Sequence, residues 1–146
     1  MLIVATLIIA SVTGVVFLVN EATQRPQDAY AMQAAGELVI AHLKLHTNQR
    51  PRNWHGLSET FAALQRAHVS VGSPLEQIQQ RIEFDWNADV SELKRSAFTN
   101  GVRPFRVVKL RNGRNTHWVG VEPNAMIWQY LQSTSPMDFV TNSIVE

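Results

Sequence analysis

The sequence contains no cysteine. This absence excludes disulfide bonds, zinc sites with thiolate ligands, iron–sulfur clusters and a cysteine nucleophile. An excess of one charge is also lacking, because thirteen Lys and Arg stand against twelve Asp and Glu and give a formal net charge of +1. Domains that bind nucleic acid are usually strongly basic, so the composition argues against a nucleic-acid partner.

Signature motifs of the common enzyme classes are missing as well. The chain has no Gly-x-Ser-x-Gly, no glycine-rich phosphate-binding loop and no dinucleotide-binding fingerprint. Its 146 residues are enough for one small domain. The sequence therefore favours a non-catalytic role and predicts no cofactor.

What the sequence does have is an uninterrupted apolar run at its start. Residues Leu2–Val19 (LIVATLIIASVTGVVFLV) are eighteen positions without a charged side chain. An α-helix of this length spans about 27 Å, close to the roughly 30 Å of a bilayer's hydrocarbon core. We therefore expect residues 1–19 to be a single transmembrane anchor that contacts the lipid bilayer. A short leading anchor before a globular domain is a common export layout, so we expect the body of the chain outside the cytoplasm.

A cleaved secretory signal is the alternative to an uncleaved anchor. Ala29-Tyr30-Ala31 has the small-x-small form of a cleavage site, but it lies about ten residues beyond the apolar run. No Lys or Arg precedes the run, where a signal peptide normally carries its basic region. The sequence therefore favours a signal-anchor that is retained.

The residues after the apolar run change to a helical pattern with polar positions. Residues 20–27 are polar and contain Pro26, which indicates either a juxtamembrane linker or a kinked helical extension. Residues 28–46 are mostly strong helix formers, and their apolar positions recur at helical spacing. We expect a long helix here, with Asp28 as its N-cap.

Further along, short helices and strands are predicted. Ser58 is expected to cap a short helix, which leaves Trp54 in the loop before it. Ile82, Phe84 and Trp86 alternate with polar residues, the pattern of a half-buried strand. Asp89 is expected to cap another short helix.

A hairpin and a last helix complete the pattern. The β-rich runs 105–110 and 116–121 flank Asn112-Gly113, a sequence that favours a hairpin turn. Pro123 stands where the first residue of a final helix would be.

These elements predict an α+β domain over residues 28–132, followed by a C-terminal tail over residues 133–146. A long helix would pack on a small antiparallel sheet made of one strand plus the hairpin, with short additional helices around it. The expected core residues are Leu38, Ile82, Phe84, Trp86, Val107, Trp118 and Val119.

His42 and His46 are the candidate metal ligands. At positions i and i+4 of one helix their imidazoles face the same side, the spacing used by helical zinc ligands. The metalloprotease version needs a Glu directly after the first His, and Leu43 stands there instead. A membrane-tethered, metal-dependent enzyme is one hypothesis. The other is a pair of ordinary helix histidines.

The second candidate site is a basic stretch. Residues 94–114 contain seven Lys or Arg and no Asp or Glu. We expect an anionic surface to bind here, through Arg106, Lys109, Arg111 and Arg114. That surface would be formed by lipid headgroups, an envelope polymer or an acidic protein partner. The alternative is a solvated hairpin whose charges prevent edge-to-edge pairing.

Tryptophan supplies the third candidate. Trp54 is expected to be a partner anchor or a membrane-interface ring. Trp86, Trp118 and Trp128 are expected to pack in the core.

The predicted order of elements resembles that of type IV pilin-like and pseudopilin subunits. An apolar leading helix runs through a proline-containing link into a longer helix and then a small antiparallel sheet. The early glutamate of those proteins is absent, since position 5 is Ala5. The first interpretation is a single-pass membrane protein that presents an interaction domain. The second, which the resemblance implies, is an assembly subunit whose anchor helix packs into a filament.

Overall fold

The structure, a computed structural model, describes the backbone of residues 2–95, 107–115 and 121–134, and the side chains of residues 23–93, 107–115 and 121–134. Helices and a two-stranded antiparallel sheet confirm the predicted α+β class. In chain order the elements are α1 (Leu2–Leu45), α2 (Trp54–Arg66), α3 (Leu75–Arg81), β1 (Ile82–Phe84), α4 (Val90–Arg95), β2 (Val108–Leu110) and α5 (Pro123–Ser133).

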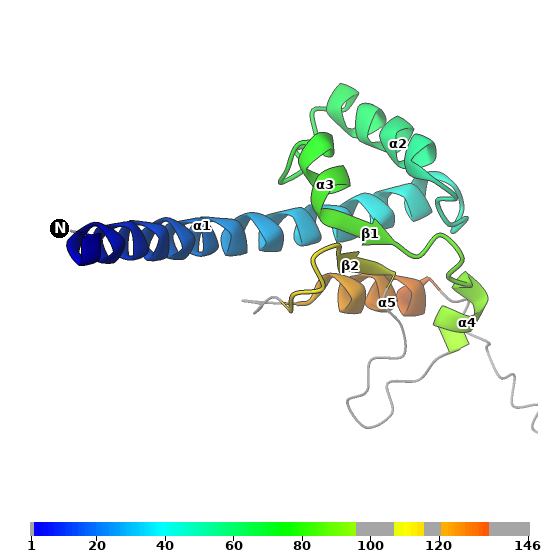
Figure 1. Cartoon of the computed structure of the whole chain (residues 1–146). Helices are drawn as coiled ribbons and strands as arrows, with labels where there is room; N and C mark the ends of the chain where they lie inside the picture. Colours follow the sequence, from blue (N-terminus) through cyan, green and yellow to red (C-terminus); the bar gives the residue numbers. More distant parts are fainter. Residues whose placement is uncertain (1, 96–106, 116–120, 135–146) are drawn as a thin grey trace, which may run out of the picture.

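The longest element is α1, a single helix of 44 residues. Its N-terminal half projects away from the other elements, and its C-terminal half packs among them (Figure 1). The helix continues through residues 20–27 and includes Pro26. Asp28 therefore lies inside the helix and is buried, so its predicted role as N-cap was wrong.

No helix in the part of the chain with described side chains is long and apolar enough to cross a membrane. The predicted anchor, Leu2–Val19, precedes that part and so lies outside the residues to which this finding applies.

The core is built on one face of α1. The buried residues of this helix are mostly small or aliphatic: Ala31, Met32, Ala34, Ala35, Leu38, Val39 and Leu43. Gly36 lets α5 come close, because a Cβ at this position would lie 2.9 Å from the Cβ of Pro123. Leu57, Ile78, Ile127 and Leu131 from the shorter helices close the core over this face.

The sheet alternates between buried and exposed residues as the sequence predicted. Ile82 pairs with Leu110 and Phe84 with Val108, and all four are buried. Trp86, expected in the same strand, lies beyond its end and is half-buried. Of the other expected core residues, Leu38 and Val107 are buried.

The second arm of the predicted hairpin, residues 116–121, falls almost wholly outside the described residues, and so do Trp118 and Val119. On the edge of β2 that faces away from β1, the side chain of Asn124 bonds to the backbone of Val108. Its Oδ1 accepts from the Val108 N–H, and its Nδ2 donates to the Val108 carbonyl, both at 2.9 Å. The amide of Asn124 therefore occupies this part of the strand edge in the manner of a neighbouring strand.

Among the shorter helices, two starts follow the predicted capping and one does not. The carboxylate of Asp89 accepts from Ser91 N at 2.7 Å at the start of α4, and Pro123 is the first residue of α5. In contrast, α2 begins at Trp54, where Asn53 is the N-cap and accepts from Gly56 N. The prediction of a cap at Ser58 and a loop at Trp54 was wrong, because Asn53 offers an equally good cap five residues earlier.

Candidate functional site

His42 lies buried where α1 packs against α2. Its Nδ1 is 2.7 Å from the hydroxyl oxygen of Thr60, and that hydroxyl donates to the carbonyl of Gly56 at 3.0 Å. A hydroxyl carries one hydrogen, so Thr60 must accept from His42, and the proton of the neutral imidazole is assigned to Nδ1. His42 therefore serves as a buried link between the two helices.

His46 stacks on His42 from the exposed side, with ring centroids 4.2 Å apart. Burial lowers the pKa of His42, and the neighbouring His46 lowers it further, while Gly56 and Glu59 act in the opposite direction. The i, i+4 spacing thus brings the two imidazoles together as predicted. Catalytic zinc sites usually take three protein ligands, and the described residues contain no group of three or more His, Cys, Asp or Glu placed to hold a metal ion.

Trp54 belongs to a small aromatic cluster. Its ring meets Phe84 and Trp86 edge-on, with centroid distances of 4.9 and 5.6 Å, and those two rings lie 5.0 Å apart. Trp54 is half-buried, so part of its surface already contacts the domain and part is exposed. A role as a partner anchor stays a prediction for the exposed part. Trp128, the remaining described tryptophan, is also half-buried.

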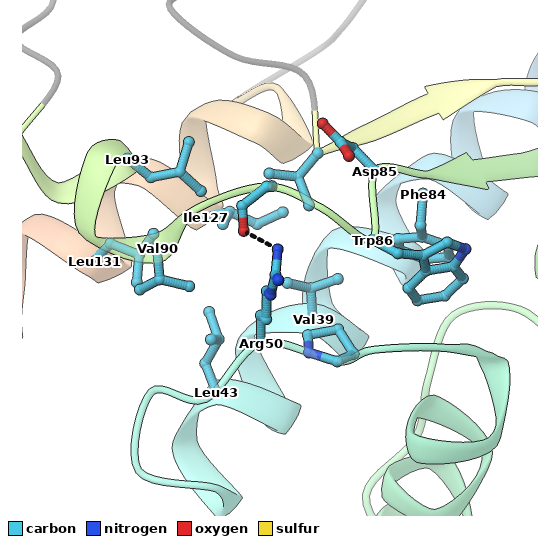
Figure 2. Close-up of a pocket in the computed structure, with 13 residues that line it drawn as sticks. Val39, Leu43, Arg50, Phe84, Asp85, Trp86, Val90, Leu93, Ile127 and Leu131 are labelled. Atoms are coloured by element: carbon cyan, nitrogen blue, oxygen red, sulfur yellow. Dashed lines mark hydrogen bonds between the residues drawn. The ribbon is translucent and has the colours of Figure 1, made fainter.

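An apolar cavity lies beside this cluster (Figure 2). Val39, Leu43, Ile127 and Leu131 line it, and Arg50 reaches across its mouth to donate from Nη1 to the carbonyl of Ala88 at 2.9 Å. Its volume is about 20 Å³. Pockets for small molecules measure about 300–1,000 Å³, whereas this one is close to the size of a single water. The cavity is a packing defect and is too small to be a substrate site.

A polar concavity lies at the end of the domain where α1 stops. It measures about 620 Å³ and is lined by Asn48, Gln49, Arg50, Arg52, Asn87, Asp89 and Val90. Asn48 is held in place because its Oδ1 accepts from the Tyr130 hydroxyl at 3.2 Å. The lining offers hydrogen-bond donors and acceptors but no Ser, Thr, Lys or His that would serve as a nucleophile with an adjacent base.

The predicted basic residues do not form one continuous group. Lys109 pairs with Glu83 at 3.0 Å on the exposed face of the sheet. Arg111 and Arg114 lie exposed in the turn after β2, where Arg111 Nε donates to the carbonyl of Gln79 at 3.1 Å. Arg106 lies outside the described residues.

The structure also shows a polar cluster that the sequence did not reveal. Arg81 donates from Nη1 to Asp28 at 2.5 Å and to Gln24 at 2.8 Å, and from Nη2 to Gln27 at 2.5 Å. Asn112 Nδ2 donates to the second oxygen of Asp28 at 3.1 Å. The common face of the three α1 residues is readable from their i, i+3, i+4 spacing. The partners are not, because they come from positions more than fifty residues away.

Comparison with known proteins gave no match: no family model, no curated protein and no solved structure resembles this chain significantly. The function must therefore be argued from the residues of the chain itself.

Proposed function

We propose that this chain is a single-pass membrane protein whose α+β domain binds a protein partner or an anionic envelope surface outside the cytoplasm, without catalysing a reaction. The observation that carries the proposal is the form of α1. One unbroken helix contains the apolar run Leu2–Val19 at one end and the main core-forming face of the domain at the other. The apolar end projects away from the domain (Figure 1).

The composition of the run supports insertion into a bilayer. Twelve of its eighteen residues are Leu, Ile, Val or Phe. Each contributes about −0.3 to −0.6 kcal/mol on the insertion scale, which gives on the order of −5 kcal/mol in total. Among the described residues, one concavity is too small for a substrate, and the other is lined by no Ser, Thr, Lys or His, which agrees with a non-catalytic role.

Extraction of membranes tests the anchor. The full chain should stay in the membrane pellet after washing with alkaline carbonate and should be released by detergent. A variant with Ile9→Arg and Val12→Arg should be lost from the pellet, because each arginine near the helix centre costs about 2.5–3.5 kcal/mol. Ile9→Leu with Val12→Leu is the matched control and should behave as the wild type. Release of the wild-type chain by carbonate alone would contradict the proposal.

A second candidate function is that of a pilin-like assembly subunit, favoured by the continuity of α1 from the apolar run into the domain. Ala5 departs from the pattern of those proteins, which carry a glutamate early in the apolar segment. Because the chain has no cysteine, single cysteines can be introduced along residues 2–19 without background. Disulfide cross-linking between copies with a helical period would support this function, and its absence at every position would exclude packing of these helices into a filament.

A further inference from the structure

The turn after β2, residues 111–114, lies at the end of the domain from which α1 emerges (Figure 1). Asn112 fixes it there with both ends of its amide. Nδ2 donates to Asp28 of α1 at 3.1 Å, and Oδ1 accepts from the backbone N–H of Arg114 at 3.0 Å. Gly113 has φ +69, a value that suits glycine in a tight turn. The turn therefore has a defined place next to α1.

The direction of α1 at this point is fixed as well. The guanidinium of Arg81 holds Gln24, Gln27 and Asp28 on one face of the helix. The negative charge of Asp28 is thereby balanced by Arg81 and does not reduce the positive charge of the other basic residues nearby.

Three exposed arginines lie around this exit point. Arg25 is on α1, three residues before Asp28, and Arg111 and Arg114 are on the turn that Asn112 ties to Asp28. We call these three residues the basal arginines. Lys109 does not belong with them, because it lies on the exposed face of the sheet, opposite Glu83, and not at this end of the domain.

Helix geometry gives the height of the basal arginines above the apolar run. Arg25 is six residues beyond Val19 and Asp28 is nine residues beyond it, which corresponds to about 9 and 14 Å along an α-helix. The headgroup layer on each side of the hydrocarbon core is about 5–8 Å thick. If the run spans a bilayer, Arg25 lies at the headgroup surface, and the turn lies within about one Debye length, 8 Å, of that surface.

We propose that the basal arginines bind the anionic headgroups of the membrane in which α1 is anchored, and so hold the domain against the bilayer surface. The inference rests on the proposed function, since it needs the apolar run to span the membrane. Guanidinium groups suit this role because they bind phosphate and carboxylate oxygens through paired hydrogen bonds. Each basic residue near an anionic surface strengthens the attraction by about fivefold.

The test uses the full chain in lipid nanodiscs. A single cysteine introduced by Asn115→Cys, at an exposed position next to Arg114, carries a fluorophore that senses its surroundings. In discs containing phosphatidylserine, the fluorophore should be less accessible to the neutral quencher acrylamide than in discs of phosphatidylcholine alone. High salt should remove the difference because it screens the charges. The same fluorophore at Asn87→Cys, in the polar concavity at the opposite end of the domain, should show no difference between the lipids.

Charge variants identify the residues responsible. Replacing Arg25, Arg111 and Arg114 together by Gln should abolish the difference between the two lipids, and each single replacement should weaken docking by about fivefold. Lys109→Gln removes a cation from the same chain segment and should leave the difference unchanged. Circular dichroism of each variant in the discs checks that the helices remain folded.

The proposed function and this inference fail in different ways. If the labelled chain does not co-elute with lipid when the discs are separated by size, the proposed transmembrane anchor is refuted. The proposed binding of headgroups by the basal arginines is then refuted as well. If it co-elutes but quenching is equal in both lipids, or if the triple variant behaves as the wild type, the anchor stands and the docking of the basal arginines is refuted.

Discussion

Arg81 forms an ion pair with the buried carboxylate of Asp28, two residues beyond Pro26, with Arg81 Nη1 2.5 Å from Asp28 Oδ1. The same guanidinium also binds Gln24, which precedes the proline, and Gln27, which follows it. A proline inside a helix removes one backbone hydrogen bond and usually costs about 3 kcal/mol or more. Arg81 links side chains on both sides of the proline and so stabilises α1 as one helix, at a place where the sequence indicated that a helix could end.

Replacing Arg81 should therefore be strongly destabilising. Arg81→Met leaves the carboxylate of Asp28 buried without its charged partner, a change that typically costs about 3–5 kcal/mol. Urea unfolding of the full chain in a non-ionic detergent, followed by tryptophan fluorescence, measures the loss. Arg66→Met removes an exposed arginine of α2 and should change stability little. Equal effects of the two substitutions would show that the pair has no special role.

Gly36→Ala should destabilise the contact between α1 and α5. Alanine favours the helix by about 1 kcal/mol over glycine, but forcing a new methyl group into a packed contact costs about 1–3 kcal/mol. The Cβ would lie 2.9 Å from Pro123 Cβ and 3.3 Å from its Cα, so backbone has to move and the clash should prevail. Gly72→Ala meets nothing within 4 Å and is the control. A thermal melt of Gly36→Ala at or above the wild-type temperature would contradict this account of the contact.

The stability of the domain should fall in mild acid because of His42. Its pKa is lowered in the folded chain, mainly by burial, from an ordinary value of about 6.5. Below that pH the unfolded chain takes up a proton that the folded chain does not, so the free energy of unfolding decreases until the pH reaches the folded pKa. In His42→Asn, the side-chain amide can still donate to Thr60 but cannot titrate, and this part of the pH dependence should disappear. Unfolding curves between pH 5 and 7.5 measure the slope.

His55 provides the control for this experiment. It is exposed on α2 and pairs with Glu59 at 3.3 Å. His55→Gln removes this exposed histidine in place of the buried one, so the two variants together separate the effect of His42 from that of losing a histidine anywhere in the domain. A His42→Asn profile parallel to that of the wild type would mean that another group causes the acid sensitivity.

Asn124→Ala should open the edge of β2. The Val108 N–H and carbonyl are buried and would lose their side-chain partner, and each buried group left unpaired costs about 1–3 kcal/mol. Hydrogen exchange at the Val108 amide should become faster, with a smaller change at the Leu38 amide inside α1. Gln129→Ala on the exposed side of α5 is the matched control. Unchanged protection of Val108 would indicate that its bonds to Asn124 are dispensable.

The sequence predicted correctly those parts of the fold that depend on interactions between residues close together in the chain. The alternation at Ile82 and Phe84, the turn at Gly113 and the helix start at Pro123 all depend on residues within a few positions of one another. The role of Asp28 depends instead on Arg81, 53 positions later, whose bonds outweigh the signal that Pro26 gives for a helix end.

The candidate sites divide in the same way. Helical spacing was enough to bring His42 and His46 together. It gave no information about Thr60, which supplies the hydrogen-bond partner of His42 from another helix. The basic stretch was interpreted as one surface because charge was counted along the chain. The fold separates its described members, since Lys109 finds Glu83 across the sheet while Asn112 directs the turn toward α1.

The continuity of α1 also couples the angular position of the domain to the number of residues below it. Each residue of an α-helix turns the chain by about 100° and lifts it by about 1.5 Å. One residue inserted between Asn20 and Thr23 would rotate the turn at residues 111–114 by about 100° around the helix axis and raise it by only about 1.5 Å. Seven inserted residues would return the turn to within about 20° of its original direction. A partner bound to one face of the projecting half of α1 therefore always has the same side of the domain above it. The number of residues in the helix determines which side that is.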